Sequence, residues 1–343
     1  MRATLLAIAS LVLAAVVVAC SSPPGATCSV GPCVTLASSQ ALPASIAVDA
    51  TNIYWTNSGT APTYQNGSVM KAPLAGGTPT TLASDQHYAY AIAVDAENVY
   101  WTNEGTAPAY DDGAVMKVPL AGGTPTTLAT KQSDPNGIRV DATSVYWTNS
   151  GAATGYTNGA VMKMPLSGGT PAMLASGQHY PYGVAVDAAN IYWADEGTAP
   201  AYADGTVMTV PLAGGGPTML ASGQHSPDGI IVDATSVYWV NGGEAPSDTD
   251  GAVVKVPLGG GTPTTLASGQ HYANSIAVDA TAVYWTTGGT APGYTDGTVM
   301  SVPLGGGTPN TLASGQLEPI GIAVSATSVY WTTISTLMKE NLK

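Results

Sequence analysis

Apolar and β-branched residues occur along this chain in short runs separated by glycine, proline and polar residues. In one representative stretch, the turn sequences Asn66-Gly67 and Ala75-Gly76-Gly77 separate runs rich in Val, Ile, Thr, Tyr and Trp, which favour strands. Each run has the length of a strand, and none is long enough for a helix. The strands predicted in this stretch are residues 46–48, 53–56, 68–74 and 80–83.

The same pattern recurs at a fixed interval of 46 residues, so the chain is built from repeats. Glycines and prolines at fixed positions in every unit exclude the helical solenoids of similar period. A four-stranded unit of roughly 40–50 residues is typical of a propeller blade. The sequence therefore predicts an all-β, seven-bladed β-propeller with four antiparallel strands per blade. The marker pairs are Tyr54-Trp55, Tyr100-Trp101, Tyr146-Trp147, Tyr192-Trp193, Tyr238-Trp239, Tyr284-Trp285 and Tyr330-Trp331.

The two ends of the repeat region are predicted to complete one blade together. The last unit contains three strands but no fourth, whereas residues 34–38 form a fourth strand without a unit of their own. Pairing them would close the ring and cover two exposed sheet edges. Cys28 and Cys33 lie just before this strand, and two cysteines this close in an exported chain predict a disulfide. The propeller is therefore assigned to residues 34–343.

The N-terminus has the pattern of a targeting segment. Arg2 precedes an apolar run over residues 5–19 that is too short to span a bilayer comfortably. The Ala19-Cys20 junction resembles the lipobox of bacterial lipoproteins, which implies a signal peptide over residues 1–19, an acylated Cys20 and a linker over residues 20–33. We expect an exported monomer anchored by lipid to the bacterial cell envelope. The alternative is an ordinary secretory signal in which Cys20 has no special role.

The repeat resembles those of known propeller families. Ile46-Ala47-Val48-Asp49 followed by Tyr54-Trp55-Thr56-Asn57 is similar to the YWTD repeats of lipoprotein-receptor propellers, which have six blades. The motif's aspartate is kept only at Asp195. The run from Pro135 to Ile138 is similar to NHL-type and gluconolactonase-type propellers. That resemblance implies that Asn136 helps to hold a divalent cation such as Ca²⁺; the sequence otherwise predicts no cofactor.

The charge balance restricts the range of partners. Acidic residues outnumber basic ones by 22 to 9, so a nucleic acid is excluded as a partner because phosphate binding needs clustered Lys and Arg. Most acids lie in the connections predicted to open at one end of the ring, where they would attract cations or a basic partner. Recurrent tyrosines in the same connections predict a contact surface there. No short catalytic motif is present.

Residues repeated in every unit are predicted to form the scaffold, and function is expected where the units differ. The repeated Trp, the Asp after the first strand and the Gln after the fourth belong to the scaffold. Four histidines follow these glutamines, and the expected spacing of about 9 Å between neighbouring blades prevents them from sharing one metal ion. Arg139 replaces a small or apolar residue and could bind an anion in the channel or pair with Asp228. One position before the first strand varies freely and is predicted to line the channel mouth: Ala44, Tyr90, Asn136, Tyr182, Asp228, Asn274 and Ile320.

Two main hypotheses for function follow from this ring. The first is a non-catalytic binding or scaffold module that engages a protein or a glycan through the acidic, tyrosine-bearing end. Its expected ligand-binding residues are Tyr90, Asn136, Arg139, Tyr182, Asp228 and Asn274. The second is a metal-dependent hydrolase or lyase of the gluconolactonase type, centred on Asn136, Asp228 and Asn274. A purely structural envelope protein is the third alternative.

Overall fold

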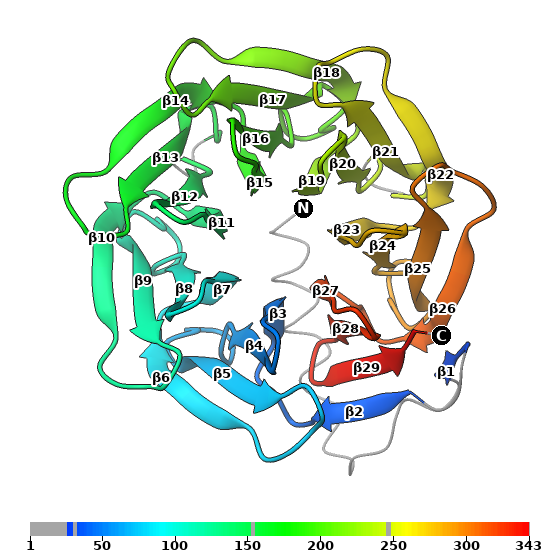
Figure 1. The fold of residues 1–343 in the computed structure, drawn as a ribbon, viewed down its shortest axis with the longest axis horizontal. Helices are drawn as coiled ribbons and strands as arrows, with labels where there is room; N and C mark the ends of the chain where they lie inside the picture. Colours follow the sequence, from blue (N-terminus) through cyan, green and yellow to red (C-terminus); the bar gives the residue numbers. More distant parts are fainter. Residues whose placement is uncertain (1–25, 30–32, 152–154, 245–247, 343) are drawn as a thin grey trace.

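The computed structural model describes residues 26–29, 33–151, 155–244 and 248–342. Within these ranges the chain forms seven antiparallel sheets arranged as a ring around a central axis (Figure 1). The sequence-based prediction of a seven-bladed β-propeller is therefore confirmed. No helix in the described ranges has the length and hydropathy to cross a bilayer.

Each blade contains four strands, which we call a, b, c and d from the axis outward. Blades 1 to 6 follow the chain in order and share the same lengths. Their strands are β3 (Pro43–Val48), β4 (Asn52–Asn57), β5 (Gly67–Pro73) and β6 (Thr80–Gln86); β7 (Ala89–Val94), β8 (Asn98–Asn103), β9 (Gly113–Pro119) and β10 (Thr126–Gln132); β11 (Pro135–Val140), β12 (Ser144–Asn149), β13 (Gly159–Pro165) and β14 (Ala172–Gln178); β15 (Pro181–Val186), β16 (Asn190–Asp195), β17 (Gly205–Pro211) and β18 (Thr218–Gln224); β19 (Pro227–Val232), β20 (Ser236–Asn241), β21 (Gly251–Pro257) and β22 (Thr264–Gln270); and β23 (Ala273–Val278), β24 (Ala282–Thr287), β25 (Gly297–Pro303) and β26 (Asn310–Gln316).

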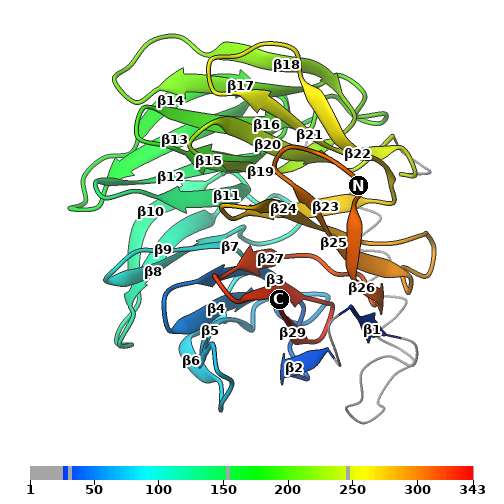
Figure 2. The same cartoon turned by 45° about the vertical axis from the view of Figure 1, so that its right-hand side comes forward.

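Blade 7 is built from both ends of the repeat region, as predicted. It contains β27 (Ile322–Val324), β28 (Ser328–Thr332) and β29 (Leu337–Asn341), and β2 (Val34–Ala37) pairs with β29 as strand d. The short strand β1 (Thr27–Cys28) adds a fifth strand to blade 6 at β26, and Figure 2 shows β1 near β26 and β2 near β29 of the neighbouring blade. The Cys28–Cys33 disulfide is formed and lies between the two strands.

The hydrophobic core lies between the blades. Each of seven clusters combines the Trp of one blade with the Tyr and apolar residues of the preceding blade; Trp101 of β8, for example, packs with Tyr54 and Val69 of blade 1. All seven tryptophans are fully buried. A Trp that buries about 200 Å² gains roughly 5 kcal/mol gross at about 25 cal/mol per Å². The tryptophans therefore stabilise the ring, as predicted.

Repeated polar residues complete the scaffold. The indole N–H of each Trp donates to the Gln at the end of the preceding blade, as in Trp147–Gln132 at 2.9 Å. The Asp after strand a accepts backbone N–H bonds in the a–b turn and a bond from the Tyr hydroxyl, as in Tyr54–Asp49 at 2.7 Å. These residues are thus fully used by the fold.

The predicted strands were too short at one end of the blade. Strand a begins at Pro43 rather than Ile46, because a bulge lets Pro43 pair with Asn57 before the regular register starts at Ile46 and Trp55. Strand d continues past Ala83 to Gln86, again through register shifts. Bulges therefore extend the sheets toward the end of the ring that carries the variable residues.

Candidate functional site

The b–c and d–a connections open at one end of the ring, because antiparallel strands place them opposite the a–b and c–d turns. We call this end the acidic face. Of the 22 acidic residues in the chain, the 14 at or beyond the ends of strands b and d belong to it. They are Glu104, Asp111, Asp112, Asp195, Glu196, Asp204, Glu244, Asp248, Asp250 and Asp296 beside the b–c connections, and Asp85, Asp134, Asp228 and Glu318 beside the d–a connections.

Lys131 in strand d of blade 2 lies at the acidic face, at the position of Asp85 in blade 1, whereas other lysines lie toward the opposite end. The lysines of strand c reach the c–d turns, where Lys71 Nζ donates to Leu120 O at 3.0 Å and Lys339 Nζ to Leu74 O at 3.2 Å. Lys71 and Lys339 also lie over the rings of their cross-strand tyrosines. Charge is therefore segregated along the ring axis, with the acidic face poorly neutralised by these lysines.

A repeated backbone pattern holds the acidic face while its side chains vary. The N–H of Tyr88 donates to Tyr64 O at 2.8 Å, and Tyr88 O accepts from the N–H of Glu104 at 3.1 Å. Equivalent bonds recur in the other blades with an extended b–c connection. The d–a residue in this pattern has a positive φ, 57° at Tyr88 and 55° at Asp134. Main-chain hydrogen bonds thus hold this d–a residue in place, so its side chain can differ from blade to blade.

This pattern defines a second variable ring, two residues before the ring predicted from the sequence. Sequence reasoning identified its tyrosines as contact residues but not its carboxylates as members of the same ring. The 46-residue spacing is the signal that could have found them. The ring consists of Leu42, Tyr88, Asp134, Tyr180, Ser226, Tyr272 and Glu318.

Tyrosines from alternate blades meet across the channel mouth. The hydroxyl groups of Tyr90 on β7 and Tyr182 on β15 are hydrogen-bonded, and their ring centroids are 5.9 Å apart at 69°. Each ring lies near the tyrosine two residues before it, with centroids 6.4 Å apart for Tyr88–Tyr90 and 6.3 Å for Tyr180–Tyr182. Two of the predicted site residues, Tyr90 and Tyr182, are therefore brought together although blade 3 lies between their blades in the ring.

Carboxylates from neighbouring blades act on Tyr272. Burial raises the pKa of the Tyr272 hydroxyl well above 10, and electrostatic interactions with the carboxylates of Asp228, Glu196 and Glu318 raise it further. These groups belong to blades 4 to 7 and to the connections between them at the acidic face. A cationic group bound there would be stabilised by several carboxylates together.

Two of these carboxylates are deeply buried. Glu318 is 8% exposed, and burial raises its pKa to about 7. Glu196 is 5% exposed, and Glu104 occupies the equivalent position of blade 2 at 1%. Burying an ionised carboxylate is unfavourable, so the face gains from any ligand that supplies positive charge.

The predicted residues of blades 3 and 6 have structural bonds of their own. Asn136 is fully buried, and its Nδ2 donates to Asp134 O at 3.2 Å and to Ser150 Oγ. Asn274 Nδ2 donates to Pro319 O at 3.2 Å in the next blade. Arg139 donates to Ile138 O at 2.9 Å, and burial lowers its pKa. In the described part of the chain it forms no salt bridge, so the suggested pairing with Asp228 is not observed.

Three of the histidines, which lie in d–a connections, contact the b–c connection of the blade that follows. His179 Nδ1 lies 3.3 Å from Thr198 Oγ1, and His271 Nδ1 lies 3.0 Å from Thr290 Oγ1. His225 differs, because its Nδ1 lies 2.8 Å from Asp250 Oδ2.

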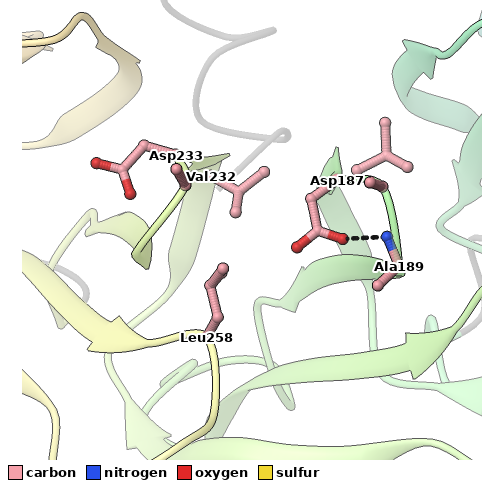
Figure 3. A pocket seen from close by; sticks show the side chains of 8 residues that line it. Asp187, Ala189, Val232, Asp233 and Leu258 are labelled. Atoms are coloured by element: carbon pink, nitrogen blue, oxygen red, sulfur yellow. Dashed lines mark hydrogen bonds between the residues drawn. The ribbon is translucent and has the colours of Figure 1, made fainter.

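The opposite end of the ring has shallow depressions between neighbouring blades. Figure 3 shows one of them between blades 4 and 5, lined by Val186, Asp187, Ala189, Val232, Asp233 and Leu258. The Asp187 carboxylate accepts from the N–H groups of Ala189 and Asn190 and from the Tyr192 hydroxyl. Its oxygens are thus engaged by the turn, and a similar depression recurs between blades 5 and 6. In these two depressions the lining residues therefore repeat the scaffold.

Comparison with known proteins places the chain by fold alone. It matches no established family model and no curated protein sequence. Virginiamycin B lyase from Staphylococcus aureus is similar over 91% of this chain and 98% of the lyase, with a TM-score of 0.66 at 13% identity. The nidogen/laminin complex matches over 65% of this chain and 83% of the matched chain, with a TM-score of 0.51 at 19% identity. A gluconolactonase from Xanthomonas campestris matches over 75% and 87%, with a TM-score of 0.53 at 14% identity.

These neighbours include both a propeller found in a protein complex and propeller enzymes. They agree with the YWTD-like and gluconolactonase-like character of the repeat. Identities this low show the shared propeller architecture, so function must be argued from the residues of this chain.

Proposed function

We propose that this protein is a lipid-anchored binding module of the bacterial cell envelope whose acidic face engages a basic segment of a partner protein. The proposal is supported by the gathering of 14 of the 22 acidic residues at the acidic face, where the carboxylates of Asp228, Glu196 and Glu318 act on the buried Tyr272. Asp228, Tyr272 and Glu318 stand at positions that differ from blade to blade, whereas the repeated residues serve the scaffold. The region is therefore specific to this chain.

The chemistry of the region suits a cationic ligand. Carboxylates attract Lys and Arg side chains, and tyrosine faces add a cation–π attraction of about 0.5–2 kcal/mol for each well-placed cation. The Tyr90–Tyr182 pair and its neighbours present aromatic rings beside the carboxylates. Tyrosine is also enriched in protein interfaces, because it buries a large area at a small cost in conformational entropy.

The membrane attachment belongs to the proposal as well. Cys20 and the apolar segment before it lie outside the described residues, so lipidation rests on their sequence pattern. The described chain begins beside β1, which is held to the outer edge of blade 6 by the pairs Thr27–Ser314 and Cys28–Ala313. An anchor attached there would leave the channel mouth accessible to a partner.

A titration with an oligolysine peptide tests the proposal. We expect saturable binding that weakens steeply between low salt and about 0.15 M salt, because exposed charges are screened over about 8 Å at that ionic strength. An oligoglutamate peptide of equal length is the control and should not bind. Absence of oligolysine binding at low salt would contradict the proposal. Salt-independent binding of an uncharged glycan, with no binding of oligolysine, would favour the glycan alternative.

A metal-dependent hydrolase or lyase centred on Asn136, Asp228 and Asn274 is the second candidate. It is supported by the Pro135-Asn136-Gly137 sequence and by the fold shared with virginiamycin B lyase and the gluconolactonase. A stoichiometric divalent ion that is lost in Asp228→Ala would favour this candidate. Unchanged metal content in that variant would exclude a metal site built on Asp228.

A further inference from the structure

Blade 5 departs from the other blades in the b–c connection that faces His225. The connections of blades 1, 2, 4 and 6 carry a threonine at the position that Glu244 occupies in blade 5. Asp248 likewise replaces a tyrosine that recurs in the other extended connections. The substitutions add two carboxylates to a loop that already contains the repeated Asp250. They concentrate potential metal ligands in one blade.

In blades 2 and 6 the repeated Asp is fully used by its own loop. The N–H of Thr290 donates to Asp296 Oδ1 at 2.7 Å, and the Thr290 hydroxyl donates to Oδ2 at 2.7 Å. Thr106 and Asp112 form the same two bonds at 2.6 and 2.8 Å. In these two blades, one threonine therefore engages both carboxylate oxygens of the aspartate, through its N–H and its hydroxyl.

Blade 5 keeps one of these bonds and loses the other. The N–H of Glu244 donates to Asp250 Oδ1 at 2.7 Å, so the aspartate is held in the same orientation. Glutamate has no hydroxyl to offer Oδ2, and this oxygen instead lies 2.8 Å from His225 Nδ1. In blades 4 and 6 the matching histidine contacts the threonine hydroxyl. With Glu in place of Thr, the histidine contacts the aspartate directly and a second carboxylate lies close to both.

The three side chains have the geometry of a small metal site. One ligand atom from each of His225, Glu244 and Asp250 lies within 4.8 Å of the other two. Ligands about 2.0–2.2 Å from a zinc ion are separated by roughly 3.3 Å in a tetrahedral site. All three side chains are at least partly exposed, so small rotations can close the remaining distance. The separation that prevents the four histidines from sharing an ion does not apply here, because a single histidine, from the connection leading into blade 5, combines with two carboxylates of the b–c connection of blade 5.

We propose that His225, Glu244 and Asp250 bind a divalent transition-metal ion such as Zn²⁺ on the rim of the acidic face. An imidazole with two carboxylates suits zinc and its neighbours in the first transition series, whereas Ca²⁺ and Mg²⁺ prefer sets made only of oxygen. Three protein ligands leave a position for water or for a donor group from a bound partner. The site is separate from Asn136, Asp228 and Asn274.

Equilibrium dialysis of the metal-stripped full chain against ZnCl₂ tests the proposal, with bound zinc measured by elemental analysis. We expect one zinc ion per chain at saturation. Glu244→Thr, which gives blade 5 the arrangement of blades 4 and 6, should weaken zinc binding at least about tenfold, and His225→Ala should do the same. His179→Ala is the matched control and should bind zinc as the wild type does. Because zinc would bind the native state alone, it should also raise Tm in the wild type but not in Glu244→Thr.

A variant designed to create a second zinc site tests the same reasoning and leaves the proposed ligands unchanged. Thr290→Glu places a glutamate beside His271 and Asp296 in blade 6 and should raise the stoichiometry from one zinc ion to two. The proposal is overturned if the wild type binds no stoichiometric zinc or if Glu244→Thr binds it unchanged. Loss of the ion in Asp228→Ala with retention in Glu244→Thr would assign it to the channel mouth instead.

Discussion

Trp55 donates its indole N–H to Gln40 Oε1 at 2.9 Å across the interface where the two ends of the repeat region meet. Gln40 follows β2, the strand that the N-terminal segment contributes to blade 7, and Trp55 lies in blade 1. The same bond joins every other pair of neighbouring blades, as at Trp147–Gln132. The closing interface is therefore equivalent to the other six, and the N-terminal segment is part of the scaffold.

Deletion of residues 28–40 should strongly destabilise the protein. The deletion removes β2, the disulfide and Gln40, which exposes the edge of β29 and leaves the Trp55 N–H without its acceptor. We expect a loss of about 5 kcal/mol or more in the free energy of unfolding, measured by chemical denaturation. An unchanged melting temperature in the deletion variant would contradict the closure.

The repeated Gln can be tested within one interface. Gln132 Oε1 accepts from Trp147 Nε1 at 2.9 Å and from Asn149 Nδ2 at 3.0 Å. Gln132→Leu leaves the buried Trp147 donor and the half-buried Asn149 donor without this acceptor and should lower stability by about 1–3 kcal/mol. Gln65→Leu changes an exposed loop residue and should stay within about 0.5 kcal/mol of the wild type. Equal effects of the two substitutions would show that Gln132 has no special role.

Asp195 should make stability fall as the pH rises. It is 6% exposed, and burial raises its pKa from 3.8 to about 7. The native chain therefore binds this proton more tightly than the unfolded chain. The associated stabilisation is complete below about pH 4 and is lost as the pH rises through about 7.

Asp195→Asn should remove this pH dependence. Four other blades have Asn here, and its Nδ2 donates to the Gln of the preceding blade, as in Asn57–Gln40 at 3.0 Å. We expect a gain of about 1–3 kcal/mol at pH 8 and little change at pH 5, measured by chemical denaturation. Equal effects at the two pH values would indicate that the charge of Asp195 is not involved.

Binding of cations to the acidic face should strengthen as the pH rises through about 7. Burial raises the pKa of Glu318 to about 7, so its charge develops in this range. Oligolysine should bind several-fold more tightly at pH 8 than at pH 6, since lysine stays charged at both values. Glu318→Gln should reduce this difference. The same pH dependence in wild type and variant would exclude Glu318 as its source.

The architecture could be predicted from the sequence because the residues that form the scaffold recur in the repeats. Trp, Gln and Asp recur at one spacing, and each repeats one structural role. The start of strand a at Pro43 could not be predicted, since it depends on a bulge in the pairing with Asn57. The Tyr90–Tyr182 contact could not be predicted from the sequence either, because it joins alternate blades and depends on the width of the ring.

The coupling of His225 to Asp250 required the structure as well. The residues are 25 positions apart, and their contact depends on the main-chain bond that orients Asp250. The substitution of Thr by Glu244 is visible in the aligned repeats, but its effect on the second aspartate oxygen is not.

The most direct test of the binding-module account compares two single charge removals at opposite ends of the ring. Asp228→Asn neutralises a carboxylate of the acidic face that acts on Tyr272, whereas Glu97→Gln neutralises an exposed carboxylate in the a–b turn of blade 2. The measurement is the Kd of oligolysine at low salt. The account predicts a Kd several-fold higher for Asp228→Asn and unchanged for Glu97→Gln, and equal Kd values for the two variants would contradict it.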